Sequence, residues 1–430
     1  MTALAINRSQ RRGACPGLSA PMPTGDGLLV RLLPIGTIPL AAFGQLCAAA
    51  RREGNGIIEV TARGSIQIRG LNAASARRFA DAVAALAIAA EDGISVLSNA
   101  LAGLDGQEIL DANALAADLR RALTQTSLTA RLAPKVSIAI DGGGVLSLAN
   151  VSADVRLRVQ ATGSGAVLRV GVAGDEASSR QVGTIAPNDG VDAVVRLLEI
   201  IAKRGRAARA RDILVADGDA PFREALAEFL IEDETPFGKR SRSGPIGLHP
   251  LRDGSLACGV GLAFGHADAV TLERLAEAAS AAGAVGIRAA ADRALMIIGL
   301  REAAVPAFGN AAERLGFIVA ADDPRRCIVA CAGAPICSSA FIAARALAPR
   351  AAEIAPSHLN SLPQIHISGC AKGCAHAGSA ALTIVGSPDG CALIASGAAC
   401  DTPFAVISTD ELPVAIERYF RDAAREDKHV

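Results

Sequence analysis

The chain has 430 residues, of which 51% are hydrophobic and 20% are charged, a composition typical of a globular protein with two to four domains. Its 43 basic and 43 acidic residues cancel, so no net charge attracts nucleic acid or an anionic membrane, and we expect neither as a partner. Near the start, a paired Arg11-Arg12 is followed by Gly, Cys and Pro instead of an apolar segment, so we expect no export signal and a cytoplasmic protein.

Two stretches of the chain resemble each other and predict an internal duplication. Gly25–Leu71 and Arg252–Leu300 each have the pattern of strand, loop, amphipathic helix, strand, tight turn and strand. Their closing Gly-Leu pairs lie 229 residues apart, and the same offset aligns Leu132–Ile140 with Ser361–Gly369. Two matches at one offset predict two halves related by a pseudo-twofold axis, with room for a large ligand between them.

Four of the ten cysteines form a pattern that predicts a metal cluster. Cys331 and Cys337 are separated by five residues, and Cys370 and Cys374, beyond a gap of 32 residues, are separated by three. In a reducing compartment such clustered thiols bind metal more often than they form disulfides. Four thiolates within Gly- and Ala-rich backbone suit a [4Fe–4S] cluster. Tetrahedral zinc is the alternative, although its sites more often have two or four residues between paired cysteines.

The neighbouring cysteines have other expected roles. Cys327 is the second candidate for the position of Cys331, and Cys15, within a Cys-Pro-Gly segment, is expected to be structural. The uncharged stretch Cys327–Ala343 contains Pro335 and three cysteines, so we interpret it as part of a buried site and not as a membrane span. With one residue of slip from the 229-residue offset, Leu101 in the first half stands where the second half has Cys331, so the duplication predicts one cluster per chain.

The four-cysteine pattern resembles the cluster signature of the sirohaem-dependent sulfite and nitrite reductase superfamily. VTARGSIQ is similar to that superfamily's tetrapyrrole-binding strand through Thr61, Arg63 and Gln67. LAPKVSIAIDGGG is similar to its Pro-Lys strand, whose lysine faces a tetrapyrrole carboxylate and is here Lys135. Within the superfamily, the stretches RRGACPGL, MPTGDGLLVRL and ISGCAKGCAH resemble the precorrin-3B synthases.

The resemblance implies an α+β fold, duplicated about a pseudo-twofold axis, with paired ferredoxin-like half-domains and two α/β lobes. Linkers are predicted at Glu91–Gly93 and in the charged, Ser-, Gly- and Pro-rich segment Glu232–Gly247. The four predicted units are a first ferredoxin-like half-domain at 17–90, a reductase-like lobe without cluster cysteines at 91–231, a second half-domain at 247–303, and a [4Fe–4S]-binding lobe at 304–430.

The activity implied by the resemblance is that of an iron–sulfur-dependent monooxygenase. It would hydroxylate precorrin-3A at C20 with dioxygen and form a γ-lactone, in aerobic cobalamin biosynthesis. The alternatives are a sirohaem-dependent sulfite or nitrite reductase and a non-catalytic iron–sulfur tetrapyrrole-binding protein. The substrate's acetate and propionate groups need Arg and Lys partners. The implied substrate-binding residues are Thr61, Arg63, Gln67, Lys135, Arg31 and Lys372, with Arg69 equally placed for surface or ligand contact.

Beside the [4Fe–4S] cluster, the resemblance implies a mononuclear non-haem iron, with sirohaem as the alternative cofactor. His366 and His376 are the imidazoles nearest to the cysteines, but no His-x-Asp/Glu pair indicates a ligand set, so packing roles are favoured for both. No glycine-rich stretch has the frame of a dinucleotide site. We therefore expect electrons from an external reductase or ferredoxin, ultimately from NAD(P)H. Catalytic residues and oligomeric state are not assigned.

Overall fold

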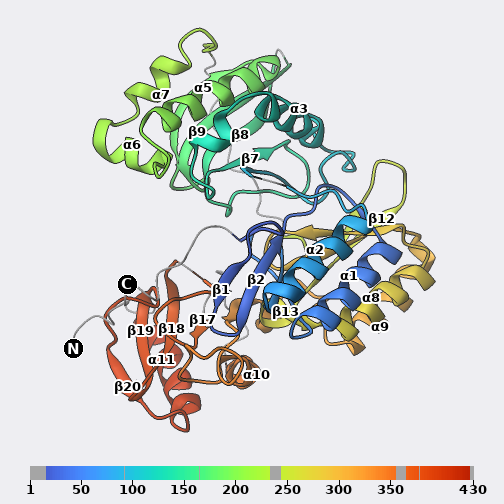
Figure 1. Ribbon diagram of the computed structural model, residues 1–430, viewed down its shortest axis with the longest axis vertical. Coiled ribbons are helices and arrows are strands. Elements are labelled where there is room, and N and C mark those ends of the chain that lie inside the picture. Colours follow the sequence, from blue (N-terminus) through green and yellow to red (C-terminus); the bar gives the residue numbers. More distant parts are fainter. Residues whose placement is uncertain are drawn as a thin grey trace.

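The computed structural model is an α+β protein in which the described residues form four five-stranded sheets. The residues described are 16–91, 93–163, 165–232, 244–354, 365–376 and 378–426. Two sheets lie side by side in a central layer covered by helices, and each of the other two forms a lobe of its own (Figure 1). Among the described helices, none combines the length and the apolar character needed to cross a membrane.

The central layer joins the two halves of the chain by exchanging strands. The first central sheet contains, in order, β1 (Met22–Thr24), β2 (Gly27–Leu32), β5 (Ile66–Leu71), β4 (Ile57–Val60) and β13 (His266–Asp268). The second contains β11 (Gly247–Pro250), β12 (Leu256–Gly261), β15 (Ala294–Leu300), β14 (Gly286–Ala290) and β3 (Ile38–Pro39). Each sheet therefore takes an edge strand from the other half, because β13 pairs with β4 and β3 pairs with β14.

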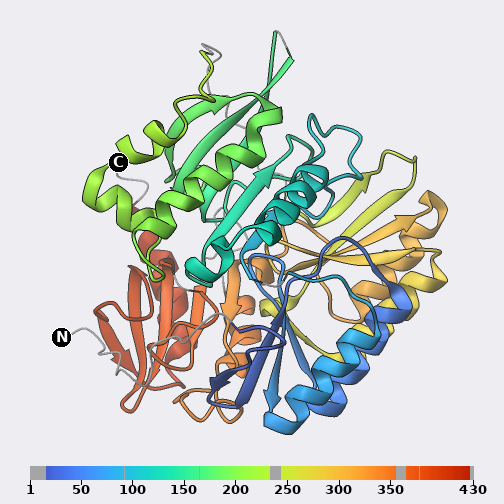
Figure 2. The same ribbon diagram turned by 45° about the horizontal axis from the view of Figure 1, so that its top comes forward.

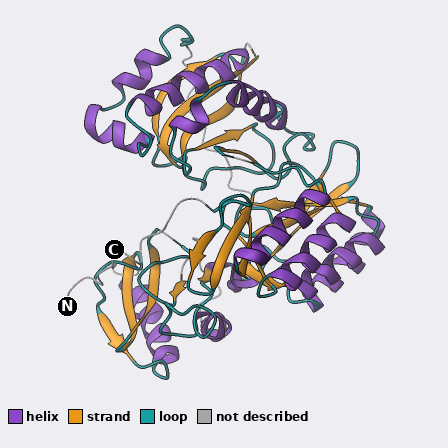
Figure 3. Ribbon diagram, viewed as in Figure 1, coloured by secondary structure: helices purple, strands orange, loops and turns teal. Residues whose placement is uncertain are grey.

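Helices cover one face of the central layer (Figure 3). They are α1 (Leu40–Glu53), α2 (Ala73–Ala85), α8 (Ala269–Ala281) and α9 (Val305–Arg314). Side chains alternate across a strand, so in β5 Ile66 and Ile68 pack into the core under the helices, at no more than 1% exposure. Gln67 and Arg69 consequently point to the opposite face of the sheet, away from these helices.

The two lobes repeat one strand order. The first contains β6 (Ser95–Ser98), β7 (Ser137–Asp141), β8 (Ala153–Thr162), β9 (Gly165–Gly174) and β10 (Arg180–Ile185). The second contains β16 (Ile328–Ala330), β17 (Ile365–Ser368), β18 (Ala380–Ser387), β19 (Gly390–Gly397) and β20 (Ala405–Ile407). In each lobe the first three strands are parallel and the last two pairings are antiparallel.

The lobes also carry their own helices, which Figure 2 shows against the sheets. In the first lobe these are α3 (Ala112–Gln125), α4 (Leu128–Arg131), α5 (Gly190–Lys203), α6 (Ala210–Asp217) and α7 (Ala220–Ala225). In the second they are α10 (Ala344–Ile354) and α11 (Leu412–Glu426). Short 3₁₀ helices are η2 (Pro187–Asp189), η3 (Ala263–Gly265), η4 (Glu302–Ala304) and η5 (Pro324–Cys327).

The predicted duplicated α+β fold is confirmed, and its repeat is regular. β2 and β12 begin at residues 27 and 256, and α1 and α8 begin at residues 40 and 269, so both pairs keep the 229-residue offset found in the sequence. The predicted unit boundaries stay predictions. The strand exchange shows, however, that the sheet of the first half is completed by β13 and that of the second half by β3.

The exchanged strand gives a test of the fold. A Cβ added at Gly286 would lie 2.4 Å from Thr37 Cγ2 and 2.6 Å from the Ile38 carbonyl oxygen, so Gly286→Ala should push β3 away from β14. We expect the free energy of unfolding to fall by about 1–3 kcal/mol in urea titrations. The control is Gly44→Ala within α1, where a Cβ meets nothing within 4 Å, and which should raise that free energy by up to about 1 kcal/mol. Equal stability of the two variants would contradict the assigned exchange.

Candidate functional site

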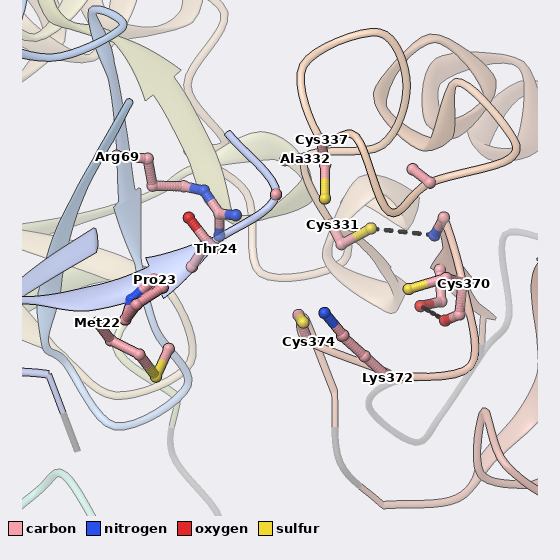
Figure 4. Close-up of a pocket in the computed structure, with 14 residues that line it drawn as sticks. Met22, Pro23, Thr24, Arg69, Cys331, Ala332, Cys337, Cys370, Lys372 and Cys374 are labelled. Atoms are coloured by element: carbon pink, nitrogen blue, oxygen red, sulfur yellow. Dashed lines mark hydrogen bonds between the residues drawn. The ribbon is translucent and has the colours of Figure 1, made fainter. Parts of the chain in front are cut away.

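The four cysteines of the sequence pattern line one pocket between the second lobe and the first central sheet (Figure 4). Its cavity, counted with its open mouth, measures about 590 Å³. Cys331 and Cys337 belong to the loop after β16, and Cys370 and Cys374 belong to the loop after β17. Because β16 and β17 are parallel neighbours, their carboxyl ends lie at one edge of the sheet, and the two loops meet there.

Glycine backbone lets these loops approach each other. The N–H of Gly369 donates a hydrogen bond to Cys331 Sγ at 3.0 Å. Gly333 has a φ of 66°, and a Cβ added there would lie 2.4 Å from the Ala344 backbone nitrogen. Gly373, between Cys370 and Cys374, has a φ of 56°. Only glycine adopts such conformations at little cost, which explains the small residues around the cysteines.

The four thiols differ in their exposure to solvent. Cys370 is buried, Cys331 and Cys337 are half-buried, and Cys374 is exposed. Burial raises the pKa of Cys331 to about 11; the Gly369 N–H opposes this shift, and the nearby thiols of Cys374 and Cys370 add to it. A thiol in such a place keeps its proton until a cation replaces it, as metal binding does.

The wall opposite the cysteines is formed by β1 and by Arg69 of β5 (Figure 4). Arg69 Nε and Nη2 donate to the two carboxylate oxygens of Asp26 at 2.9 and 2.8 Å, and its Nη1 lies 3.7 Å from Glu59 Oε2. Burial lowers the pKa of Arg69, but the hydrogen bond to Asp26 and the charges of Glu59 and Asp26 outweigh it and hold that pKa above its ordinary value. This guanidinium is therefore a fixed positive charge beside the cysteines.

Glu59 of β4 connects several cationic side chains of this wall. Its two carboxylate oxygens accept from Arg345 Nη2 at 2.8 Å and from Gln67 Nε2 at 3.0 Å. Gln67 Oε1 in turn accepts from Arg31 Nε and Nη2 at 3.1 and 2.7 Å. Arg31, Gln67 and Arg69 thus share one face of the first central sheet, as the register of β2, β5 and β4 requires.

Arg345, near the start of α10, fits an anion at the cysteines. Its Nε and Nη1 are buried and have no hydrogen-bond partner among the described residues. Burial lowers the pKa of Arg345, and Glu59 and the nearby Cys331 partly oppose this shift. Unpartnered N–H groups of a buried cation are costly unless a negative group accepts them. Arg345 does not itself line the pocket, but it interacts electrostatically with Cys331. Four thiols that line one pocket, with this cation close to one of them, fit an anionic [4Fe–4S] cluster.

The structure places the other predicted substrate residues in different positions. Lys372 lines the cysteine pocket, and its Nζ donates to Ser339 Oγ at 3.4 Å. Arg63 lines a second cavity of about 530 Å³ and donates to the Ser152 carbonyl oxygen of the first lobe at 2.6 Å. Lys135 is exposed in the turn before β7. Of the six predicted substrate residues, Lys372 lines the cysteine pocket, and Arg63, Lys135, Thr61, Gln67 and Arg31 do not. The substrate roles of all six stay predictions.

Thr61 and Gln67 act on neighbouring residues. Thr61 Oγ1 accepts from the backbone N–H groups of Arg63 and Ser65 at 3.3 and 3.1 Å, so it caps the tight turn that carries Arg63. Gln67 orients Arg31 through the hydrogen bonds given above. Both residues shape the positions of arginines, whatever those arginines bind.

In the part of the chain that the structure describes, the His, Cys, Asp and Glu side chains, the four pocket cysteines included, form no single-ion metal site. The rings of His366 and His376 meet edge to face with centroids 5.7 Å apart. Within the described residues, no three His, Cys, Asp or Glu side chains lie close enough to hold one metal ion, so the expected mononuclear iron has no ligand set there. Cys327 is buried and is not one of the residues lining the pocket, and Cys15 lies outside the described residues.

Sequence reasoning missed three acidic or basic residues of the site. Asp26 and Glu59 lie far from the cysteines in the chain, and the register of the strands brings both of them to Arg69, which lines the pocket. Arg345 had a signal in the sequence, because it is the first charged residue after the uncharged stretch Cys327–Ala343. A lone cation at the end of such a stretch is a candidate partner for the anion that the stretch binds.

The contribution of the Glu59 contacts to the stability of the fold can be measured by substitution. In Glu59→Gln, Arg345 and Arg69 lose their shared negative partner inside a largely buried wall, where Glu59 and Arg345 are only 15% and 13% exposed. We expect the free energy of unfolding to drop by about 2 kcal/mol or more. The control Glu417→Gln breaks the exposed pair with Arg421 and should cost less than about 0.5 kcal/mol. If urea titrations gave the same loss of unfolding free energy for both variants, the contacts of Glu59 would contribute no more to stability than an exposed ion pair does.

Comparison with known proteins is consistent with this geometry. Residues 20–86 match the nitrite/sulfite reductase ferredoxin-like half domain. The fold is similar to that of the NirA protein of Mycobacterium tuberculosis, with a TM-score of 0.74 and 20% identity over 92% of this chain and 80% of that one. A precorrin-3B synthase from Sinorhizobium sp. is 39% identical over 414 residues, which cover 96% of this chain and 89% of the relative. The chain therefore belongs to the precorrin-3B synthase family and has a fold of the nitrite/sulfite reductase type.

Proposed function

We propose that the protein is an oxygenase that converts precorrin-3A to precorrin-3B. One atom of dioxygen becomes the hydroxyl at C20, the other leaves as water, and the ring A acetate closes to a γ-lactone. Two electrons enter from a separate reductase or ferredoxin, ultimately from NAD(P)H. The observation that carries the proposal is the pocket in which four cysteines face an arginine-bearing sheet, in a chain related to a precorrin-3B synthase over nearly its full length.

The cysteines Cys331, Cys337, Cys370 and Cys374 are the proposed ligands of a [4Fe–4S] cluster. Such a cluster, when bound, supplies single electrons. The spacing of the cysteine pairs favours the cluster over zinc, whose sites more often have two or four residues between paired cysteines. The Gly369 N–H on Cys331 Sγ and the unpartnered N–H groups of Arg345 support an anionic occupant.

The substrate's carboxylates would meet cations on both sides of the cysteines. Lys372 reaches into the pocket from the cysteine loop, and Arg31 lies on the facing sheet with its guanidinium fixed by Gln67. Arginine forks of this kind bind carboxylates in two-point contacts. Arg63 and Lys135 would act farther out, with Thr61 holding the turn that presents Arg63. Cys374 is the exposed thiol of the four, so the macrocycle would lie on its side of the pocket.

The second candidate function is a sirohaem-dependent sulfite or nitrite reductase. The match of residues 20–86 to the nitrite/sulfite reductase half domain supports it. The two functions differ in what occupies the space beside Cys374: a permanently bound sirohaem in a reductase, and an exchangeable substrate in an oxygenase. The alternative is therefore decided by whether the purified protein carries a tightly bound chromophore.

The ligand assignment predicts which cysteine variants lose iron. Cys370→Ala and Cys337→Ser should each lose most of the acid-labile sulfide and iron of protein purified without oxygen, because three thiolates hold the cluster poorly. Cys400→Ala is the control, since that exposed cysteine is not one of the pocket residues. Iron and sulfide assays give the result directly. Full iron content in either pocket variant, or equal loss in the control, would show that other residues bind the metal.

The activity predicts where labelled oxygen goes. With precorrin-3A, a chemical reductant and isotopically labelled dioxygen, the anaerobically purified protein should form a product that carries one labelled atom, detected by mass spectrometry. Cys370→Ala should form none. Product formation without dioxygen would refute the oxygenase. Tightly bound sirohaem together with sulfite or nitrite reduction would establish the alternative.

A further inference from the structure

The tight turn Thr24–Gly27, between β1 and β2, lies directly on the cysteine pocket. Residues 22–25 line the cavity opposite the thiols (Figure 4). The carbonyl oxygen of Gly25 accepts a hydrogen bond from the backbone N–H of Ser338 at 3.0 Å. A Cβ added at Gly25 would lie 2.5 Å from Cys337 Sγ, so the backbone of the turn is in contact with this thiol. A larger residue at this position would force either the turn or the Cys337 side chain to move.

An ion pair holds the turn in this position from the other side. Asp26 accepts both hydrogen bonds of the Arg69 fork, and its Oδ1 also accepts from Thr24 Oγ1 at 2.7 Å. The two charged side chains are only 4% and 7% exposed. Gly27 has a φ of 111°, and a Cβ there would lie 2.6 Å from the Leu71 carbonyl oxygen, so the turn closes tightly against β5. The turn is thus fixed between the sheet and the cysteine loop.

The turn covers one side of the pocket and leaves the other side open. Cys337 lies beneath it and is half-buried, whereas Cys374 is exposed. A cluster at the four thiols would be covered on the Cys337 side by the backbone of the turn and would remain accessible on the Cys374 side. An enzyme that uses dioxygen must admit it near the substrate while limiting its attack on an oxygen-sensitive cluster, and solvent exposure is one of the features that tune such clusters.

We propose that Asp26 and Arg69 are positioning residues that latch the Thr24–Gly27 turn over Cys337 and shield the cluster on that side. This inference rests on the proposed cluster. It also assigns the Arg69 fork to Asp26, which leaves substrate binding to the other cations. The opposite possibility is that Asp26 only occupies Arg69 until a substrate carboxylate displaces it, and the two roles predict different behaviour of the same variant.

The second repeat provides a matched control. Asp253 lies in the equivalent turn before β12, where at the 229-residue offset it stands at the position of Thr24; it is exposed, and its side chain bonds only to Ser255 of the same turn among the contacts described. Asp26→Asn and Asp253→Asn therefore make the same chemical change in equivalent turns. Only the first removes a charge that holds the turn on the pocket. A second variant, Gly25→Ala, crowds the contact between the turn and the Cys337 loop and keeps both residues of the ion pair.

The experiment measures cluster loss from anaerobically purified protein after addition of air or of an iron chelator, followed by the cluster's visible absorption. We expect Asp26→Asn to lose its cluster about tenfold faster than the unaltered protein, since a charge-assisted hydrogen bond contributes enough to shift an opening equilibrium by that factor. Gly25→Ala should change the rate in the same direction. Arg69→Lys, which keeps the charge but not the fork, should be intermediate, and Asp253→Asn should be unchanged.

Steady-state kinetics distinguish two roles of Asp26: holding the turn over Cys337, and competing with a substrate carboxylate for Arg69. The latch predicts that Asp26→Asn leaves the KM for precorrin-3A unchanged. A lowered KM with an unaltered rate of cluster loss would overturn the proposal, because Asp26 would then be competing with substrate. Equal rates of cluster loss in Asp26→Asn, Gly25→Ala and the unaltered protein would also overturn it. If the unaltered protein held no cluster, the proposed function itself would fail, so the two failures are distinguishable.

Discussion

The parallel pairing of β16 with β17 is the interaction on which the site depends. Two parallel neighbours end at the same edge of a sheet, so the loops that follow them meet without any further device. Each of these loops carries two cysteines, and both contain glycines at φ values that let the backbones pass close to the thiols. A lobe of this topology offers a binding place at its strand ends, and the central sheet covers that place from the other side. The pocket is therefore a consequence of strand order, and the cysteines give it its chemistry.

The duplicated frame carries opposite chemistry in its two halves. In the first central sheet the face toward the cysteine lobe bears Arg31, Gln67 and Arg69. At the 229-residue offset the second sheet has Val260, Met296 and Ile298 at these positions.

The segment of the first half that resembles the Cys331 loop is likewise apolar. Leu101 is fully buried in an apolar cluster with Met296 and Ile298, where the other half has a thiol-lined pocket. In the first lobe, apolar residues pack against the second central sheet. Between the second lobe and the first central sheet there is instead a cavity, and the charged Arg69 and Lys372 are among the residues that line it. The apolar interface fixes the first lobe on the central layer, and the charged interface is available for a ligand.

The parts of this architecture that could be predicted from sequence are those encoded by local patterns. Alternation in IQIRGL, helical spacing in the Ala- and Leu-rich segments, and one offset shared by two segments give the elements and their duplication. The spacing of Cys331, Cys337, Cys370 and Cys374 brings them to one pocket because each pair lies within a short loop. The exchange of β3 and β13 was not predicted, because a two- or three-residue edge strand has no pattern of its own.

The partners of the cationic residues could not be predicted either. Asp26, Glu59 and Arg345 come from separate parts of the chain, and their meeting depends on strand register and on the seating of α10 against the sheet. Motif similarity predicted substrate roles for Arg63 and Lys135, and these roles stay predictions: Arg63 bonds to the Ser152 carbonyl oxygen of the first lobe, and Lys135 lies exposed before β7. A motif fixes which residue occurs at a position in a strand, whereas the direction in which a long side chain points depends on every element packed around it.

The central claim is that four thiolates converge on one cluster between the second lobe and the charged sheet. Mössbauer spectroscopy of protein labelled with the appropriate iron isotope and purified without oxygen tests it most directly, because it reports the environment of all iron in the sample. The account predicts that the iron gives the signal of a single [4Fe–4S] cluster, at about four iron atoms per chain. Iron present only as sirohaem, or cysteines occupied by zinc with no cluster signal, would contradict it.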